Sequence, residues 1–354
     1  MAVQSLKPKE FLSYSSLSPI LDVRSPGEYR HAHIPGAISL PLFNDKERAI
    51  VGTAYKQESR EAAIKLGLDY FGSKMRNMVE EAENFIKAGP NPSEKTILIH
   101  CWRGGMRSGA VAWLLDLYGF KVYTLEGGYK AYRNWVLAQF EKSYSFNILG
   151  GNTGSGKTYI LLNMRKKGHH IIDLEGLANH KGSAFGNIGM PEQPGPEMFE
   201  NMLAKELFYQ SDGGNTIWLE DESQRIGNVH IPVALWQTMR TSPVYFLKIP
   251  FDERLKFLIK EYGILEKERL VNAIIRIRKR LGGLETKNAI SFLIEDNVEE
   301  AFRILLHYYD KFYNRSLQNR SDWEKLVHYI PCIDVDENKN YHLIIDKAGF
   351  VTSG

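Results

Sequence analysis

Short apolar runs alternate with longer amphipathic stretches along the first 140 residues. Four runs have the length of buried strands: residues 20–23, 37–40, 96–100 and 121–125. Helical patterns lie between them, notably over residues 58–65, 75–87 and 109–117. Gly119 is placed to end the last of these helices. Strands that alternate with helices predict a parallel sheet covered on both faces, so an α/β fold is expected.

The alternation restarts after the polar segment 139–145, which predicts a domain boundary near residue 142. Further strands are expected at residues 146–149, 170–173, 216–219 and 244–248. Helices are expected at residues 159–165, 197–209 and 232–239. From residue 251 to about 320 the pattern is helical, with a break at Gly282 and Gly283. We therefore predict one domain at 1–141 and an αβα domain with a helical C-terminal part at 142–354.

The composition is that of an ordinary globular protein, with 43% apolar and 25% charged residues among 354. No apolar run reaches the roughly 18 residues that cross a bilayer, and the first residues lack the layout of a secretion signal. We therefore expect a cytoplasmic protein with no membrane partner. Two cysteines exclude a disulfide framework. Cys332 lies in an apolar, strand-like context and is expected to be a buried structural thiol.

A cysteine opens the loop that follows the run 96–100. The loop reads Cys101, Trp102, Arg103, Gly104, Gly105, Met106, Arg107 and Ser108. Glycines let the backbone turn its amides toward a bound anion, and the arginines add positive charge. A cysteine at a helix N-terminus among such groups is biased toward the reactive thiolate. Cys101 is therefore the candidate nucleophile of a donor-binding loop; Trp102 could stack on a base or pack beneath the loop.

This part of the chain resembles the rhodanese domain in four ordered segments. They are residues 21–24, Glu28 with Tyr29, residues 33–37 and residues 126–129. One departure matters, because Cys101 and Arg107 enclose five residues where many sulfur-transferring members have four. With His100 and Ser108, this spacing is similar to the His-Cys-x5-Arg-Ser loop of cysteine phosphatases, which encircles a phosphate. The loop is therefore expected to accept a phosphate-bearing donor; the alternative is a degenerate scaffold with a structural cysteine.

A second anion-binding loop follows the run 146–149. It reads Gly151, Asn152, Thr153, Gly154, Ser155, Gly156, Lys157 and Thr158, which completes the P-loop pattern. The amides are expected to wrap phosphates, Lys157 to reach a terminal phosphate and Thr158 to hold Mg²⁺. Asp221, after the run 216–219, is the acidic candidate for that metal site. The histidines at 169, 170 and 180 show no zinc spacing, so no structural metal is expected.

The two loops, fused in this order, resemble the tRNA 2-selenouridine synthase family. Three further blocks carry the resemblance: residues 173–186, 220–227 and 278–283. It implies replacement of sulfur by selenium at C2 of the wobble 2-thiouridine of tRNA. It also implies selenophosphate as donor and an S-geranylated intermediate made from geranyl diphosphate. Cys101 would be the nucleophile or selenium carrier and the P-loop would grip the diphosphate; no tightly bound cofactor is expected beyond Mg²⁺ accompanying that ligand.

The net charge of +3 is too small to indicate a nucleic-acid partner, but its distribution is uneven. Residues 253–280 contain nine Lys or Arg and only four Glu. At the end of this stretch lie Arg276, Arg278, Lys279 and Arg280, the predicted contacts to tRNA phosphates. The alternative is a solvated helix face. For the whole chain, the rivals are a sulfurtransferase or cysteine phosphatase coupled to an NTPase domain, and an RNA-binding scaffold without activity.

Overall fold

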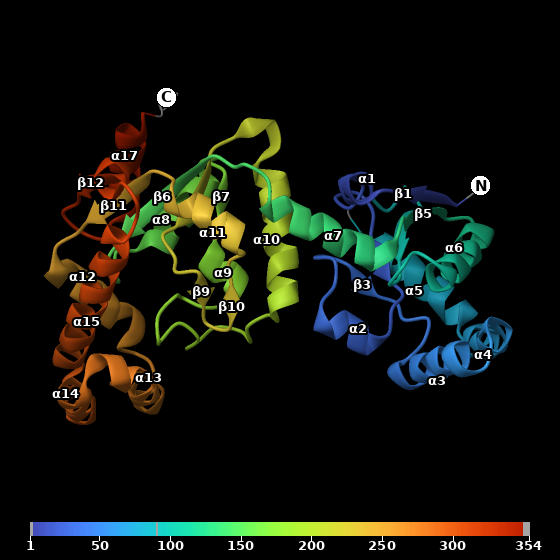
Figure 1. The fold of residues 1–354 in the computed structure, drawn as a ribbon, viewed down its shortest axis with the longest axis horizontal. Coiled ribbons are helices and arrows are strands. Elements are labelled where there is room, and N and C mark those ends of the chain that lie inside the picture. Colours follow the sequence, from blue (N-terminus) through green and yellow to red (C-terminus); the bar gives the residue numbers. More distant parts are fainter. Residues whose placement is uncertain (1–2, 90, 350–354) are drawn as a thin grey trace. The chain divides into compact units, whose positions relative to one another are not determined.

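A computed structural model describes residues 3–89 and 91–349. The chain divides into two compact units, residues 1–139 with 200–205 and residues 140–199 with 206–354. Each unit has its own five-stranded sheet, and every strand pair in the two sheets is parallel (Figure 1). No helix among the described residues is long and apolar enough to cross a membrane.

The sheet of the first unit has the order β1-β5-β4-β2-β3. Its strands are β1 (Gln4–Leu6), β2 (Ile20–Asp22), β3 (Ile38–Ser39), β4 (Thr96–His100) and β5 (Lys121–Leu125). Its helices are α1 (Pro8–Ser13), α2 (Pro26–His31), α3 (Asp45–Gln57), α4 (Arg60–Gly72), α5 (Met75–Ala88), α6 (Met106–Tyr118) and α7 (Gly128–Phe140). Every residue of the central strand β4 is buried, so the loop after it starts from a rigid support.

The sheet of the second unit has the order β12-β11-β6-β8-β7. Its strands are β6 (Phe146–Gly151), β7 (Ile171–Ile172), β8 (Ile217–Glu220), β11 (Val244–Lys248) and β12 (Val327–Pro331). A short antiparallel pair, β9 (Arg225–Ile226) and β10 (Val229–His230), stands apart from this sheet. The central strand β6 leads into the P-loop, which therefore lies at the carboxyl edge of the sheet, where α/β proteins bind ligands.

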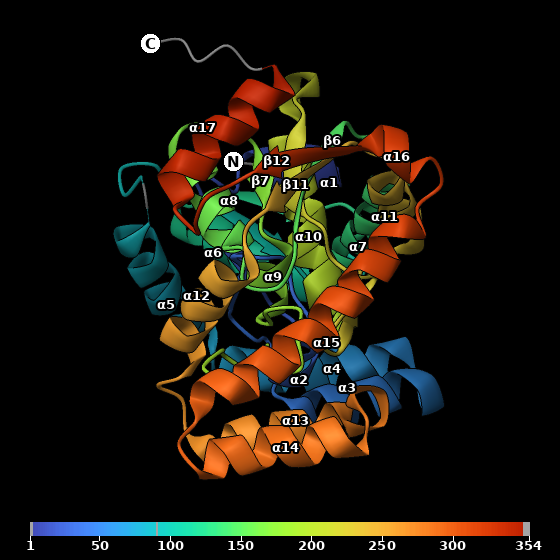
Figure 2. The ribbon, with the colours of Figure 1, turned by 90° about the vertical axis from the view of Figure 1, so that its left-hand side faces the viewer.

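The helices of the second unit fall into two groups. One group comprises α8 (Lys157–Lys166), α9 (Leu174–Ala178), α10 (Pro196–Gln210, of which residues 200–205 belong to the first unit), the 3₁₀ turn η1 (Asp212–Gly214), α11 (Val233–Arg240), α16 (Trp323–Leu326) and α17 (Glu337–Ala348). The others are α12 (Phe251–Tyr262), α13 (Lys267–Leu281), α14 (Gly283–Ile294) and α15 (Val298–Gln318). These four lie together (Figure 2), and they share an apolar core that also includes Phe185 and Ile188. In the sequence they form a helical insertion between β11 and β12, two strands that are neighbours in the sheet.

The predicted α/β fold with a helical C-terminal part is confirmed, and the strands at 96–100, 121–125 and 244–248 match the prediction. Gly119 ends α6 in a left-handed conformation, and the break at Gly282 separates α13 from α14. The helical pattern predicted at 58–65 lies in α4 from residue 60 on, but α3, which precedes it, was not predicted. Two helices meet there, because Asn44 caps α3 and Ser59 caps α4 through hydrogen bonds from Glu47 N and Ala62 N.

Candidate active sites: a cysteine loop and a phosphate loop

The cysteine loop joins the end of β4 to the start of α6. Its backbone makes a tight turn in which Gly104 has φ of +64°. A Cβ on Gly104 would meet Leu125 O at 2.7 Å, and a Cβ on Gly128 would meet Cys101 O at 2.4 Å. The segment at 127–128 is therefore pressed against the back of the loop, and Tyr129 N donates to Cys101 O over 2.8 Å. This close approach explains why both segments are rich in glycine.

The sulfur of Cys101 lies on the inner side of this loop. Cys101 is only 3% exposed, whereas residues 102–106 are all exposed, so a donor has to enter the loop itself to reach the sulfur. Ser108 Oγ lies 3.2 Å from the sulfur and 3.1 Å from Gly105 O, so its one proton can be donated to either. Burial by itself raises the pKa of the Cys101 thiol. Hydrogen bonds from Ser108 and Arg103 outweigh burial and hold that pKa below its ordinary value.

Arg107 is held by a carboxylate from a distant part of the sequence. Its Nη1 and Nη2 donate to the two oxygens of Glu28 over 2.7 and 3.3 Å, a bidentate pair that fixes the plane of the guanidinium. The positive charge of Arg107 also lowers the pKa of Cys101. Glu28 was recognised only as part of the rhodanese resemblance, and no local pattern indicated that it orients Arg107.

His100, below the loop, does not supply positive charge to the sulfur. It is fully buried, and burial lowers its pKa to about 4 although Asp22 Oδ2 lies 3.6 Å from its Nε2. Asp22 is instead paired with the buried Arg24 over 2.6 Å. Trp102 is 38% exposed and its ring lies 5.7 Å from that of Tyr129, a position compatible with both predicted roles.

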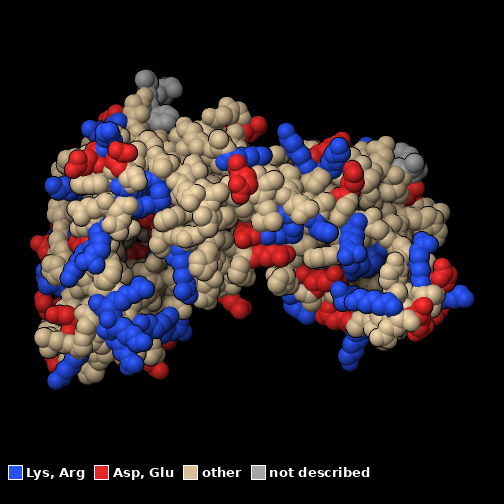
Figure 3. Space-filling model, in the orientation of Figure 1, with Lys and Arg blue, Asp and Glu red and all other residues tan. Residues whose placement is uncertain are grey.

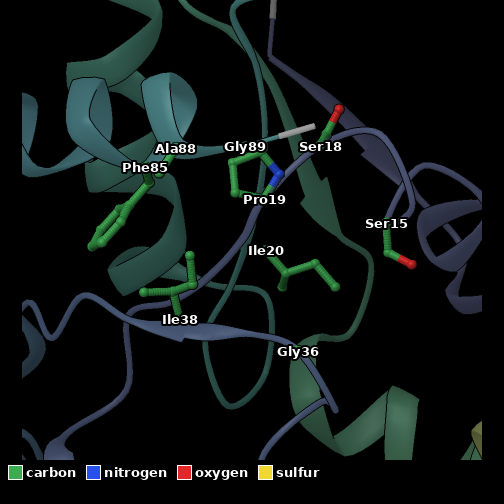
Figure 4. A pocket seen from close by; sticks show the side chains of 9 residues that line it. All are labelled: Ser15, Ser18, Pro19, Ile20, Gly36, Ile38, Phe85, Ala88 and Gly89. Carbon is green, nitrogen blue, oxygen red and sulfur yellow. The ribbon is translucent and has the colours of Figure 1, made fainter. Parts of the chain in front are cut away.

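A cavity of about 250 Å³ in the first unit is separate from this site. Figure 4 shows Ile20, Ile38 and Phe85 among the side chains that line it. Ile20 is the first residue of β2, whereas Cys101 follows the last residue of the parallel neighbour β4. The cavity therefore lies at the amino ends of the strands, and the cysteine lies at their carboxyl ends.

The P-loop leads from β6 into α8 and is held from two sides by the long helices of its own unit. Gly151 N donates to the hydroxyl of Tyr313, on α15, over 3.2 Å. Arg254, on α12, donates to Thr153 O over 3.0 Å and forms a bidentate pair with Asp310 over 2.7 and 2.8 Å. These contacts hold the backbone of the loop at Gly151 and Thr153, which favours a loop shape that is set before any phosphate binds.

The first turn of α8 presents the predicted lysine and threonine. Lys157 Nζ donates to Gly151 O over 2.9 Å, so the ammonium lies across the loop. Thr158 Oγ1 donates to Glu175 Oε2 over 3.0 Å. Glu175 is also hydrogen-bonded to Glu222. Burial raises the pKa of Glu175 and, more strongly, that of Glu222, which favours a shared proton between the two carboxyls.

Residues 144–328 match the family model described as the tRNA 2-selenouridine synthase AAA domain, and residues 7–134 match the rhodanese-like domain. A relative from Sulfurovum sp. (strain NBC37-1), named tRNA 2-selenouridine synthase, is 34% identical over 86% of this chain and 90% of its own length. A relative of the same name from Bdellovibrio bacteriovorus is 32% identical over 90% of this chain and 94% of its own. The chain belongs to the tRNA 2-selenouridine synthase family.

The family that the sequence motifs indicated is therefore confirmed. The name of these relatives, tRNA 2-selenouridine synthase, is that of an enzyme, as was predicted for this chain. Among solved structures, the N-terminal domain of a protein from Clostridium difficile 630 is 41% identical to this chain. It covers 38% of this chain and 99% of its own, with a TM-score of 0.35.

In this member of the family, the acidic group at the P-loop differs from the prediction. Asp221 was expected to accompany Thr158, but its carboxylate accepts from Arg320 over 2.5 Å and from Tyr313 over 2.6 Å. Both oxygens of Asp221 are thus engaged by Tyr313 and Arg320. The carboxylate that contacts Thr158 Oγ1 is that of Glu175, and only its place in the block 173–186 could have suggested it.

The predicted tRNA-binding residues all lie on the last turns of α13. Arg276, Arg278, Lys279 and Arg280 are exposed, and Figure 3 shows Lys and Arg side chains gathered over this helix. Arg276 Nη1 donates to Asn187 Oδ1 over 3.4 Å. Since an amide oxygen carries no net charge, this contact does not neutralise the charge of Arg276. The structure thus brings these four cations together on one exposed helix end, whose C-terminal dipole favours positive charge.

Replacing Ser108 with Ala is expected to make Cys101 less reactive at neutral pH. The thiolate loses a hydrogen bond that stabilises it, so the pKa of Cys101 rises and its alkylation profile moves to higher pH. Iodoacetamide labelling followed by peptide mass analysis across a pH series measures this shift. Cys332 is an internal reference, because burial raises its pKa to about 11. An unchanged Cys101 profile in the variant would show that Ser108 does not stabilise the thiolate.

Proposed function

We propose that this chain replaces sulfur by selenium at C2 of the wobble 2-thiouridine of tRNA in two steps. The P-loop unit transfers a geranyl group to the sulfur, and the cysteine-loop unit then delivers selenium from selenophosphate. The observation that supports this most directly is the geometry of the cysteine loop, in which Ser108 Oγ lies 3.2 Å from the sulfur of Cys101 and Glu28 orients Arg107, in a chain whose relatives are named tRNA 2-selenouridine synthase. A thiocarbonyl sulfur leaves poorly, whereas an alkylated sulfur leaves as a thiol.

In the first step, the sulfur of 2-thiouridine attacks C1 of geranyl diphosphate. The C–S bond forms, the C–O bond breaks, diphosphate leaves and the base loses its N3 proton. Negative charge grows on the leaving oxygen, and the P-loop amides with Lys157 are positioned to stabilise it. This use of a P-loop requires no hydrolysis of ATP.

The residues near Thr158 fit Mg²⁺ accompanying the diphosphate. Thr158 and Glu175 offer a hydroxyl and a carboxylate 3.0 Å apart, the oxygen donors that Mg²⁺ prefers, and a diphosphate would supply others. When bound, the ion would offset charge on the leaving group. Within residues 3–89 and 91–349, no group of three or more His, Cys, Asp or Glu is arranged to hold a metal by itself. Magnesium would therefore bind together with its ligand.

In the second step, electron balance favours Cys101 as a nucleophile toward phosphorus. Transfer of selenium onto the cysteine as a selenenylsulfide, with phosphate as product, would require a two-electron oxidant. Attack of the thiolate on phosphorus requires none: the S–P bond forms, the Se–P bond breaks and hydrogen selenide leaves. Selenide then attacks C2 of the geranylated base and expels geranylthiolate, its proton passes to N3, and water hydrolyses the phosphocysteine.

The geometry of the loop supports this assignment. Arg107, held by Glu28 through Nη1 and Nη2, contributes positive charge to the loop, which favours a bound phosphoryl anion. The Ser108 hydroxyl, 3.2 Å from the sulfur, can stabilise the cysteine thiolate when it is released from phosphorus. The five residues between Cys101 and Arg107 provide room for a tetrahedral anion, as in the phosphatase loops that the sequence resembles.

We infer that the exposed end of α13 binds the phosphate backbone of the tRNA. Changing Arg276, Arg278, Lys279 or Arg280 to Ala is expected to weaken binding and to lower the slope of log K against log salt by roughly 1 for each phosphate that the variant no longer neutralises. Fluorescence titration of tRNA at several salt concentrations measures both. Lys347→Ala, on α17, is the matched control because it removes an exposed charge elsewhere in the same unit. Equal slopes in all variants would mean that α13 does not bind phosphates.

Mass analysis of tRNA nucleosides tests the function as a whole. The unchanged protein is incubated with 2-thiouridine-containing tRNA, geranyl diphosphate, Mg²⁺ and selenophosphate, each donor being omitted in turn. We expect S-geranyl-2-thiouridine without selenophosphate and 2-selenouridine with both donors. Turnover of an aryl phosphate without geranyl or selenium incorporation would favour the rival, a cysteine phosphatase coupled to an NTPase domain.

A further inference from the structure

Two aromatic rings on the outer face of α15 lie next to the basic end of α13. Phe312 is 39% exposed, and the centre of its ring lies 4.7 Å from that of Tyr308, one helical turn earlier. Arg280 donates a hydrogen bond to the Tyr308 hydroxyl, so the last turn of α13 meets α15 at this pair. One of the four predicted tRNA contacts is therefore joined directly to an aromatic surface.

The charges around the two rings favour an anionic partner. Lys311 and Arg315 are exposed and lie three and seven positions after Tyr308, on the same side of the helix. Asp310, the acidic residue of this stretch, lies on another side, where it is paired with Arg254 over 2.7 Å. The outer face of α15 therefore combines aromatic rings with positive charge.

This combination is typical of surfaces that hold single-stranded RNA. Lysine and arginine neutralise the phosphates, while unpaired bases stack on aromatic side chains. Bases inside a duplex are already stacked on one another and present no free face to a protein ring. The outer face of α15 thus fits an unpaired base better than paired RNA.

Another face of the same helix touches the P-loop. Tyr313, next to Phe312 in the chain, accepts a hydrogen bond from Gly151 N over 3.2 Å. An α-helix with its side chains is roughly 10–12 Å across, so the rings and the P-loop backbone are separated by about that distance. Successive nucleotides of a strand are spaced by at least roughly 3.4 Å. A base on the rings and a base at the P-loop can therefore be a few nucleotides apart in one loop.

We propose that Tyr308 and Phe312 stack an unpaired base of the tRNA anticodon loop, while the cations around them hold its phosphates. The inference rests on tRNA as the substrate in the proposed function and adds a contact that selects a single-stranded loop over paired RNA. Phosphate contacts alone position an RNA without providing this selectivity.

Binding of RNA in the absence of any donor tests the proposal. Phe312→Ala is expected to weaken binding of an anticodon stem-loop by about tenfold or more, the usual effect of losing one stacked base. The slope of log K against log salt should stay unchanged, since no charge is removed. A fully paired RNA duplex of the same length should bind the variant and the unchanged protein equally. Fluorescence anisotropy titrations at several salt concentrations measure all three quantities.

Two further substitutions at position 312 separate stacking from apolar packing. Phe312→Tyr keeps an aromatic ring and should bind the stem-loop about as tightly as the unchanged protein. Phe312→Leu keeps an apolar side chain without a ring and should lose nearly as much affinity as Phe312→Ala. Tyr329→Ala is the matched control, because it removes an exposed ring from β12 of the same unit, and its affinity should be unchanged.

Three results would overturn the proposal. They are an unchanged stem-loop affinity of Phe312→Ala, an equal loss for the stem-loop and the paired duplex, and full affinity of Phe312→Leu. Circular dichroism melting checks that each variant is folded. Because no geranyl or selenium donor is present, these measurements decide the stacking contact separately from the two-step chemistry. If the unchanged protein binds no tRNA at all, the proposed function is wrong as well.

Discussion

Replacement of Cys101 by Ala is expected to abolish selenium incorporation into tRNA and to leave geranyl transfer within about twofold of the unchanged protein. Loss of a covalent nucleophile typically lowers turnover by roughly three orders of magnitude or more. Geranyl transfer needs only the P-loop unit in our proposal, so it does not depend on the sulfur. The variant should therefore accumulate S-geranyl-2-thiouridine when both donors are present, and nucleoside mass analysis measures the two products together.

Cys332→Ala is the matched control for this experiment. It removes the other cysteine, which is buried in the core of the second unit and has a raised pKa, so both activities should persist. If Cys101→Ala loses selenation and geranyl transfer alike while it still folds and binds tRNA, our assignment of one step to each unit is incorrect. Persistence of selenation in that variant would remove Cys101 from the mechanism.

Replacement of Lys157 by Ala is expected to lower geranyl transfer by about two to three orders of magnitude, the usual effect of losing a charge that stabilises a leaving group. Selenation of 2-thiouridine should fall with it, because the geranylated base is no longer made. Selenation of tRNA that was geranylated beforehand should continue, since that step uses the cysteine loop. Supplying such tRNA to the variant and measuring 2-selenouridine distinguishes the two effects.

Lys166→Ala, at the other end of α8, is the control for removing a positive charge from the same helix. Lys157 also donates to Gly151 O, so the melting temperature of the variant has to be compared with that of the unchanged protein. A folded Lys157→Ala protein that transfers geranyl at the normal rate would show that the P-loop does not bind the leaving diphosphate.

Both loops could be found in the sequence because each consists of consecutive residues. Cys101 to Ser108 and Gly151 to Thr158 carry their own turn-forming glycines, and the strands before them are continuous apolar runs. The strand at 4–6 and the helix at 128–140 were missed. β1 has only three residues and is defined by its pairing with β5, in which each residue lies 119 positions from its partner, and no local pattern contains such a pairing.

Partners that come from far along the chain could not be predicted. Glu28 and Arg107 are separated by 79 positions, and Tyr313 is 162 positions from Gly151. Asp221 shows a different limit. The acidic cluster after β8 was visible, but Asp221 and Glu222 lie beyond the last strand residue, where no strand period predicts which way a side chain points. In the structure Glu222 is hydrogen-bonded to Glu175, while Asp221 is paired with Arg320.

The helical insertion α12–α15 between β11 and β12 has a consequence for biosynthesis. β12 completes the edge of the second sheet beside β11, and α17 packs against α8, with Asn163 Nδ2 donating to Asn338 Oδ1 over 3.0 Å. These last elements support the helix that carries Lys157. On the ribosome, the nascent P-loop unit therefore remains incomplete until β12 and α17 have emerged, whereas the cysteine-loop strands are available much earlier.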